Sequence, residues 1–170
     1  MQIRKSTERD LSVLMAIFDE ARGTIARLGI NQWQDGYPSL DVVGEDVALG
    51  RSYAIEAEGE VCGTLVLIDD GEPTYDHIEG GHWLTGDESR SYVAIHRVAV
   101  AVKNRGSGIS AGLLEYAARY AAEQGRISLR IDTHEGNVVM RRMLEKNGFS
   151  YCGVIYLANG DPRVAYEKRL

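Results

Sequence analysis

"VAVAVKNRGSGISAGLL", residues 98–114, sets the architecture of this chain. An apolar run leads into a basic segment, two glycines follow with one residue between them, and an alanine-rich pattern of helical spacing begins. This order predicts a strand that passes through a glycine turn into a helix. Such a turn directs free backbone N–H groups and the positive end of the helix dipole at one point, which suits a phosphate.

The glycines have a specific use in such a turn. A Cβ atom would keep phosphate oxygens away from the backbone, and the turn needs backbone angles that other residues resist. Lys103 and Arg105 add positive charge beside them, although the formal net charge of the chain is -6. A plain tight turn with exposed basic residues is the alternative interpretation.

Two classes of phosphate ligand compete for this turn. Gly106, Gly108 and Ala111 fit the G-x-G-x-x-G/A pattern of dinucleotide binding, and Asp132 follows where that pattern places its ribose acid. However, a basic segment separates the strand from the first glycine. The chain after Asp132 also has room for only one more helix and a hairpin. A nicotinamide enzyme is therefore the weaker alternative.

The composition excludes several classes of protein. With 170 residues, 44% of them hydrophobic and 26% charged, we expect one folded domain over residues 1–170. The acidic net charge argues against a nucleic-acid partner. No apolar run suits a signal peptide or a membrane span, so we expect a cytoplasmic protein. Cys62 and Cys152 lie far apart in strand-like runs, which indicates small core residues.

The remaining segments predict an alternation of strands and helices. A first helix begins near Thr7 and Asp10, a second begins at about Ser39, and residues 52–69 form a hairpin that turns at residues 58–59. The strand over residues 92–102, its following helix and the strand over residues 127–132 form a βαβ unit, and hence a parallel pair. A helix closed by Gly148 and a last hairpin follow. We expect Val139, Met140, Met143 and Leu144 of that helix to share one stripe.

A long acidic segment, "DDGEPTYDHIEGGHWLTGDES", spans residues 69–89 without periodicity. Loops of this length tend to be functional or mobile, so we expect a lid here. Its carboxylates would attract a cationic amine or simply be solvated. His77 and His82 lack the setting of a metal site, and we predict no metal. The carboxylates of this segment belong to Asp69, Asp70, Glu72, Asp76, Glu79, Asp87 and Glu88.

"RVAVAVKNRGSGISAGLL" followed by "NVVMRRMLEKNGF" at residues 137–149 resembles the paired motifs of the GCN5-related N-acetyltransferases (GNAT superfamily). These motifs are [Q/R]-x-x-G-x-[G/A] after a strand and N-x-x-A-x-x-L-Y-x-x-x-G-F. The match covers residues 95–149, and the order of elements fits the family over essentially the whole chain. The resemblance implies an α/β fold with a mixed central sheet of about six to seven strands, a parallel pair at its centre and about four flanking helices.

The resemblance also implies acetyl-CoA as cosubstrate and no metal. The strand over residues 95–102 would hold the pantetheine arm through backbone groups, almost as an added strand. The glycine turn would hold the pyrophosphate, with Lys103 where the family carries glutamine or arginine, and Asn137 would steady the arm. The implied donor-binding residues are Val98, Val100, Lys103, Arg105, Gly106, Ser107, Gly108, Ile109 and Asn137.

One departure from the family pattern affects the chemistry. The tyrosine that often protonates the departing thiolate is replaced by Leu144, and Met140 replaces a small residue. Either Tyr92, Tyr151 or Tyr156 reaches the sulfur, or the thiolate leaves without a dedicated acid, because a thiol titrates near pH 8.5.

Acetyl transfer needs a neutral amine, whereas a free alkylamine with a pKa of about 10 is mostly protonated at neutral pH. His96 lies two residues before Val98, and the ordinary histidine pKa of about 6.5 suits a base. Some family members that acetylate arylalkylamines carry a histidine on this strand, although packing against the sheet is the alternative role. In "DTHEGN", residues 132–137, His134 either contacts substrate or shapes the loop. We name His96, His134 and Tyr156 as candidate catalytic residues.

The acceptor is the least defined part of the prediction. Trp33 and Tyr37 lie between the first two helices, a segment that in this family commonly walls the acceptor pocket, and Asp132 ends a central strand. A loop anchored by Trp33 is the structural alternative. We predict an N-acetyltransferase that acts on a primary amine, a small molecule rather than a protein, by direct attack in a ternary complex. A catalytically weak acyl-CoA-binding sensor and a nicotinamide oxidoreductase are the alternatives, and a homodimer is left open.

Overall fold

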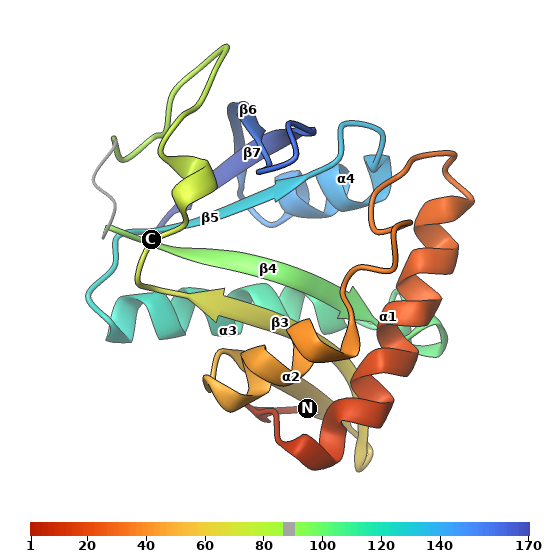
Figure 1. Ribbon diagram of the computed structural model, residues 1–170. Coiled ribbons are helices and arrows are strands. Elements are labelled where there is room, and N and C mark those ends of the chain that lie inside the picture. The colour runs from red at the N-terminus through yellow and green to blue at the C-terminus, as the bar shows by residue number, and fades with distance from the viewer. Residues whose placement is uncertain (87–90) are drawn as a thin grey trace. The chain divides into compact units, whose positions relative to one another are not determined.

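The computed structural model describes residues 1–86 and 91–170. The strands of these residues form a seven-stranded sheet in the order β1-β2-β3-β4-β5-β7-β6, and four α-helices accompany it (Figure 1). Strands β4 (Tyr92–Val100) and β5 (Ser128–Thr133) are parallel, whereas β1–β2, β2–β3, β5–β7 and β6–β7 are antiparallel. The predicted mixed α/β sheet with a parallel pair is confirmed.

The chain divides into two compact units. The first comprises residues 1–67 and 97–116, and the second comprises residues 68–96 and 117–170. Strand β4 supplies residues to both units. Its first half, up to His96, belongs to the second unit, and its last residues belong to the first.

The first unit begins with three antiparallel strands, β1 (Gln2–Lys5), β2 (Ser52–Ala57) and β3 (Glu60–Ile68). The hairpin between β2 and β3 turns at Glu58 and Gly59, whose φ angles are 55° and 82°. Two successive positive φ angles match the twist of the flanking strands. The predicted hairpin turn is therefore confirmed.

Helices α1 (Leu11–Ala26) and α2 (Leu40–Ala48) supply most of one apolar cluster of this unit. At the start of α1 the Asp10 carboxylate accepts the Thr7 N–H at 2.7 Å, and at the start of α2 the Ser39 hydroxyl accepts the Val42 N–H at 3.3 Å. Both predicted helix starts are confirmed. The apolar faces of the helices share one core, which contains Leu14, Ile17, Phe18, Ala21, Val43, Val47, Ala99 and Ala101.

Helix α3 (Ile109–Glu123) packs closely on the β2–β3 hairpin at its first turn. A Cβ atom on Gly63 would lie 3.0 Å from Ile109 Cγ2 and 3.0 Å from Ile55 Cγ2. Real Cβ atoms rarely have neighbours this close, so the bare backbone of Gly63 allows the helix to approach the sheet. In Figure 1, α2 lies in front of β3 and α3 behind it.

The second unit is built on β5, β7 (Pro162–Arg169) and β6 (Ser150–Tyr156), with β7 in the middle. Helix α4 (Val138–Lys146) begins at Asn137, whose Oδ1 accepts the Met140 N–H at 3.2 Å, and Gly148 follows its end with φ 85°. The predicted helix is confirmed, but the predicted stripe is wrong for Val139, which is 62% exposed. The prediction is confirmed for Leu144, which is fully buried.

The acidic segment is anchored over its described residues 69–86, and the lid expected there stays a prediction. Tyr75 and Trp83 are buried, and Trp83 Nε1 donates to the Tyr75 carbonyl at 2.9 Å. Glu79 exchanges two backbone hydrogen bonds with Val154 of β6, at 2.9 and 2.8 Å. Two aromatic anchors and a bridge to a strand hold the segment against the second unit. Asp87 and Glu88 lie outside the described residues.

A buried ion pair adds a further anchor to this segment. Arg130 Nε lies 3.1 Å from Glu167 Oε1, and the two side chains are 2% and 0% exposed. The Arg130 guanidinium lies between the rings of Trp83 and Tyr92, with its carbon 4.3 and 4.1 Å from their centroids. Glu167 also accepts hydrogen bonds from Ser128 and from the segment itself. Cation–π contacts of this desolvated kind are among the stronger ones.

Two smaller observations complete the fold. Cys62 and Cys152 are buried free thiols, as the sequence predicts. Within residues 1–86 and 91–170, no helix combines the length and the apolar character that crossing a bilayer requires.

Candidate active site

The glycine loop, residues 103–109, joins β4 to α3 in the first unit. A 3-10 turn at Val102–Asn104 leads into it, and Gly106 and Gly108 have φ angles of 79° and 84°. A Cβ atom at either glycine would meet nothing within 4 Å, so space opens beside the backbone. Among residues 1–86 and 91–170, no group accepts a hydrogen bond from the N–H of Gly106, Gly108 or Ile109. Unpaired N–H groups at a helix N-terminus favour an anion.

The charged residues of the loop make other contacts. The Arg105 N–H donates to the Val102 carbonyl at 3.2 Å, and the Arg105 guanidinium donates to Thr24 Oγ1 at 2.7 Å. The Ser107 hydroxyl donates to the Asn104 carbonyl. The loop therefore offers the backbone of its glycines to a ligand more directly than it offers the backbone of Arg105.

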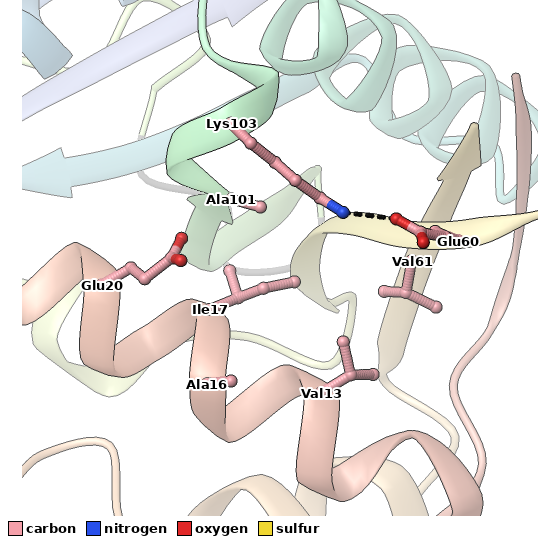
Figure 2. Close-up of a pocket in the computed structure, with 8 residues that line it drawn as sticks. All are labelled: Val13, Ala16, Ile17, Glu20, Glu60, Val61, Ala101 and Lys103. Carbon is pink, nitrogen blue, oxygen red and sulfur yellow. Dashed lines mark hydrogen bonds and ion pairs between the residues drawn. The ribbon is translucent and has the colours of Figure 1, made fainter. Parts of the chain in front are cut away.

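Lys103 points into a pocket beside the loop, where its ammonium pairs with Glu60 (Figure 2). Next to this pair, the Glu20 carboxylate accepts the Val102 N–H at 2.7 Å. The pocket has a volume of about 450 Å³ and an apolar wall from α1. Two carboxylates, Glu20 and Glu60, thus occupy donors next to the unpaired N–H groups of the loop. The pocket is lined by Val13, Ala16, Ile17, Glu20, Glu60, Val61, Ala101 and Lys103.

Strand β4 changes conformation at Arg97, whose φ angle is 50°. Its side chain pairs with the buried Asp46 of α2, with Nη2 2.7 Å from Oδ1 and Nε 2.7 Å from Oδ2, and it also donates to the Tyr37 hydroxyl. Burial lowers the pKa of Arg97, but the nearby Tyr37 and Asp46 outweigh burial and raise it. A non-glycine residue in the left-handed region persists only where its surroundings hold it. The sequence did not indicate this pair.

Of the two predicted acceptor residues between α1 and α2, only Tyr37 joins a polar network. Trp33 packs edge-on against Phe18, with ring centroids 5.9 Å apart, and lies 6.3 Å from the Tyr37 ring. Its φ angle is 62°, and its ring covers the core of the first unit. These contacts favour the structural alternative, a tryptophan that anchors the loop.

His96 lies in a polar cluster of the second unit, here called the His96 cluster: His96, Glu72, Tyr75, Tyr92 and Asp132. His96 Nε2 lies 3.0 Å from Glu72 Oε2, and the two side chains are 18% and 17% exposed. The imidazole stacks on Tyr75 at 6.0 Å and 26°, and the Tyr75 hydroxyl donates to Asp132 Oδ1 at 2.8 Å. The Glu72 N–H donates to the Tyr92 hydroxyl at 3.0 Å.

Electrostatics keep Glu72 ionised in this cluster. Burial alone would raise its pKa, but His96 and then hydrogen bonds from Thr74 outweigh burial and lower the pKa to about 2. Burial raises the pKa of Tyr75 well above its usual value, and the Asp132 carboxylate adds to the rise. Perturbed groups that gather around a histidine are typical of functional sites.

The other candidate catalytic residues make contacts that give them no evident acid–base role. His134 Nδ1 accepts the Gly136 N–H at 3.0 Å, which shapes the loop before α4. Tyr156 is 41% exposed, and its hydroxyl donates to Glu79 Oε2 at 3.0 Å. Tyr151 is half-exposed, and the Leu144 that stands in the acid position is fully buried.

Strand β4 pairs with β5 only briefly. The parallel register joins Tyr92, Val93 and Ala94 to residues 128–130 and ends there. Val98 and Val100 lie further along β4 and are half-buried. No cluster of three or more metal-ligating side chains is found in the part of the chain that the structure describes, and the expectation of no metal stays a prediction.

Comparison with known proteins identifies the family. The profile of the acetyltransferase (GNAT) family matches residues 16–149. This chain belongs to the GNAT acetyltransferase family. This family assignment disfavours the dinucleotide interpretation of the glycine loop.

Solved GNAT structures resemble the chain over nearly its full length. An acetyltransferase of the GNAT family from Streptococcus agalactiae 2603 is 35% identical, with a TM-score of 0.85 over 99% of this chain and 95% of that one. A ribosomal-protein-alanine N-acetyltransferase from Brucella melitensis (22% identity, TM-score 0.70, all of both chains) shares the fold. A PaiA N-acetyltransferase from Thermoplasma acidophilum, solved in complex with coenzyme A, also shares the fold. It is 17% identical, with a TM-score of 0.71 over 99% of this chain and 98% of that one. No curated protein sequence matches the chain.

Sequence reasoning missed the partners of His96. Glu72 was noted only as one of several loop carboxylates, and Tyr75 was not singled out. One signal was present: Glu72 is followed by Pro73 and Thr74, and an acidic cap before a proline indicates the start of a helical turn. That signal predicts the turn, but it does not predict which histidine the carboxylate faces.

Proposed function

We propose that this GNAT protein transfers the acetyl group of acetyl-CoA to a primary amine of a small molecule, by direct attack in a ternary complex. The glycine loop carries the proposal, because its unpaired N–H groups at the start of α3 fit a pyrophosphate. The complex of the Thermoplasma protein with coenzyme A supports the same ligand class.

The donor would contact residues of both motifs. We propose that Gly106, Gly108 and Ile109 hold the pyrophosphate through their N–H groups, with Ser107 between them and the charges of Lys103 and Arg105 nearby. Val98 and Val100 would bind the pantetheine arm through the backbone, which the short pairing of β4 with β5 supports. Asn137 would steady the arm and also caps α4.

His96 is the proposed general base. It belongs to the same strand as Val98 and faces an ionised carboxylate, which stabilises the imidazolium that forms when it takes a proton. Tyr156 is a poor acid for the thiolate, because its hydrogen bond to Glu79 raises its pKa. We therefore propose that the thiolate leaves without a dedicated acid. His134 would act through the shape of its loop.

The acceptor side is proposed from the polar groups around His96 and Arg97. Asp132 would attract a cationic amine, and Tyr37, held by Arg97, is the second proposed acceptor residue. We propose one acyltransferase domain over residues 1–170. A cytoplasmic location and a homodimer remain predictions.

Binding of the donor tests this function first. Acetyl-CoA is expected to raise the melting temperature of the protein, whereas NAD is expected to leave it unchanged, because only a ligand that binds the folded state stabilises it. Stabilisation by NAD alone would contradict the proposal.

Gly108→Ala is expected to weaken acetyl-CoA binding about ten- to hundredfold, because the added Cβ would keep a phosphate oxygen from the backbone N–H and one charge-assisted hydrogen bond contributes about 1.5–3 kcal/mol. Calorimetric titration measures the effect. Gly160→Ala is the matched control, since Gly160 has a φ of 86° against 84° for Gly108 and equally open surroundings. It should show the same backbone strain with unchanged affinity. Equal affinity in both variants would rule out the glycine loop as the pyrophosphate site.

Glu60→Gln is expected to tighten acetyl-CoA binding a few-fold at low salt, because the ammonium of Lys103 is no longer paired with a carboxylate. The gain should vanish at high salt, where exposed charges are screened. Glu58→Gln makes the same change of charge in the same hairpin on an exposed side chain. A similar gain in both variants would show a general effect of net charge and no role for Lys103.

One observation favours a second candidate, an acyl-CoA-binding sensor. Leu144 stands at the acid position, and its alkyl side chain, which is fully buried, has no proton to give to the thiolate. Release of free thiol should be followed against polyamines, aminoglycosides, amino acids and arylalkylamines. Tight donor binding without thiol release across this panel would support the sensor.

A further inference from the structure

The contact between His96 and Glu72 bears on which imidazole nitrogen acts as the base, an inference that rests on the proposed function. Glu72 Oε2 lies 3.0 Å from His96 Nε2, a charge contact without hydrogen-bond geometry, and the buried Nε2 has no hydrogen-bond partner among the residues that the structure describes. At this distance a lone pair on Nε2 would repel the lone pairs of the carboxylate, whereas a hydrogen on Nε2 is attracted to them. The carboxylate therefore favours, in neutral His96, the tautomer with its hydrogen on Nε2 and its lone pair on Nδ1.

We propose that Glu72 is a positioning residue for the transfer reaction, and that it makes Nδ1 of His96 the atom that accepts the proton of the amine. Glu72 touches neither donor nor acceptor in this account. It acts by fixing the tautomer and orientation of the imidazole and by stabilising the imidazolium.

The carboxylate is itself held in place. Glu72 Oε1 accepts the Thr74 N–H at 3.2 Å and the Thr74 hydroxyl at 2.9 Å, which leaves Oε2 for His96. The Glu72 N–H donates to the Tyr92 hydroxyl, so the backbone before the 3-10 turn Pro73–Tyr75 is also held. The lowered pKa of Glu72 keeps it ionised at neutral pH.

The remaining groups around the imidazole restrict it further. Tyr75 stacks on the ring from the 3-10 turn, and Asp132 of β5 holds the Tyr75 hydroxyl. Tyr92 of β4 approaches Glu72, and the Arg130 guanidinium covers the Tyr92 ring. Glu72 is the carboxylate in direct contact with the ring, so it should dominate the choice of tautomer.

The proton and electron balance is simple. The acceptor ammonium gives one proton to Nδ1, which yields the neutral amine and an imidazolium with Nε2–H against Glu72. The amine nitrogen attacks the thioester carbonyl, a C–N bond forms, and the C–S bond breaks with its electron pair on sulfur. The thiolate takes the second proton from nitrogen, and the imidazolium returns its proton to solvent.

Glu72→Gln tests the assignment with almost no change of shape. The amide oxygen is needed by the Thr74 donors, so the NH₂ group would face His96 Nε2 and require a lone pair there. The variant should therefore move the hydrogen of His96 to Nδ1. Ring ¹⁵N chemical shifts of the free protein report the tautomer at a pH where imidazole is neutral, and the His96→Gln spectrum identifies the resonances.

Wild-type protein is expected to show Nε2–H, and Glu72→Gln to show Nδ1–H. A wild-type Nδ1–H tautomer overturns the proposal, whether or not the protein acetylates amines. Because this measurement needs no substrate, its failure and the failure of the proposed function are separate results.

With a substrate amine in hand, kcat of Glu72→Gln is expected to fall on the order of ten- to hundredfold at neutral pH, as for other groups that orient a histidine. The KM for acetyl-CoA should stay unchanged, and the loss should shrink as the pH approaches the pKa of the amine. Asp76→Asn, an exposed carboxylate of the same segment, should behave as wild type. A loss that is equal at all pH values would indicate a merely structural Glu72.

Discussion

His96→Ala is expected to lower kcat by about 10²- to 10⁴-fold at neutral pH, the usual contribution of a positioned general base. Without the imidazole, only the small fraction of amine that is already neutral can react, since an alkylamine titrates near pH 10. The rate of the variant should therefore rise with pH until the amine is deprotonated in solution. Steady-state rates of thiol release between neutral pH and the amine pKa measure this profile.

Two controls separate chemistry from folding in this experiment. His96 stacks on the buried Tyr75, so His96→Gln keeps more of the packing and should show the same pH profile. The melting temperature gain with acetyl-CoA should be retained in both variants, because no donor contact is assigned to the imidazole. If the rates of His96→Ala and wild type follow the same pH profile, His96 is not the base.

Arg130→Met is expected to lower the free energy of unfolding by about 3–5 kcal/mol, because it leaves the fully buried Glu167 carboxylate without its cation. For a chain of this size that corresponds to a fall of roughly 6–20 °C in melting temperature. The double variant Arg130→Met with Glu167→Gln should recover part of the loss, since it removes the unpaired charge. Chemical unfolding of the single and double variants measures the coupling.

Acid should also reduce the stability that the buried Arg130–Glu167 ion pair contributes. Burial would raise the pKa of Glu167, but hydrogen bonds from Ser128 and Thr85 and the charge of Arg130 hold it below its usual value. A lowered pKa in the folded state contributes stability above the unfolded pKa of about 4.3, and this contribution is lost as the pH falls through the folded value. Lys103→Met breaks an exposed pair and should change stability little at any pH. A loss for Arg130→Met no larger than for Lys103→Met would contradict the role of the buried pair.

The donor half of the site could be predicted from sequence because its parts are close together along the chain. The strand, the glycines at 106 and 108 and the start of α3 follow one another, and each has a local signature. The second motif likewise contains the expected helix, which is followed by Gly148 with a positive φ angle of 85°. Local patterns of this kind determine element type and turn geometry.

The His96 cluster could not be predicted in the same way. Glu72 and His96 meet through an irregular segment whose path has no periodicity, and its anchors, Tyr75 and Trp83, show their burial only in the fold. Composition suggested that the acidic segment is a solvated lid, but packing of its aromatic rings and the buried Arg130 outweighed its charge. Pairing of Arg97 with Asp46 depends in the same way on contacts far apart in sequence.

Acetylation of an amine by the purified protein is the most direct test of the central claim. The protein should be incubated with acetyl-CoA and each amine of the panel, and both free thiol and the mass of the amine should be followed. We expect, for at least one small amine, equimolar thiol and a product heavier by one acetyl group, and both should form about 10²- to 10⁴-fold more slowly in His96→Ala at neutral pH. Thiol release without acetylated amine, or acetylation that His96→Ala leaves unchanged, would contradict the account.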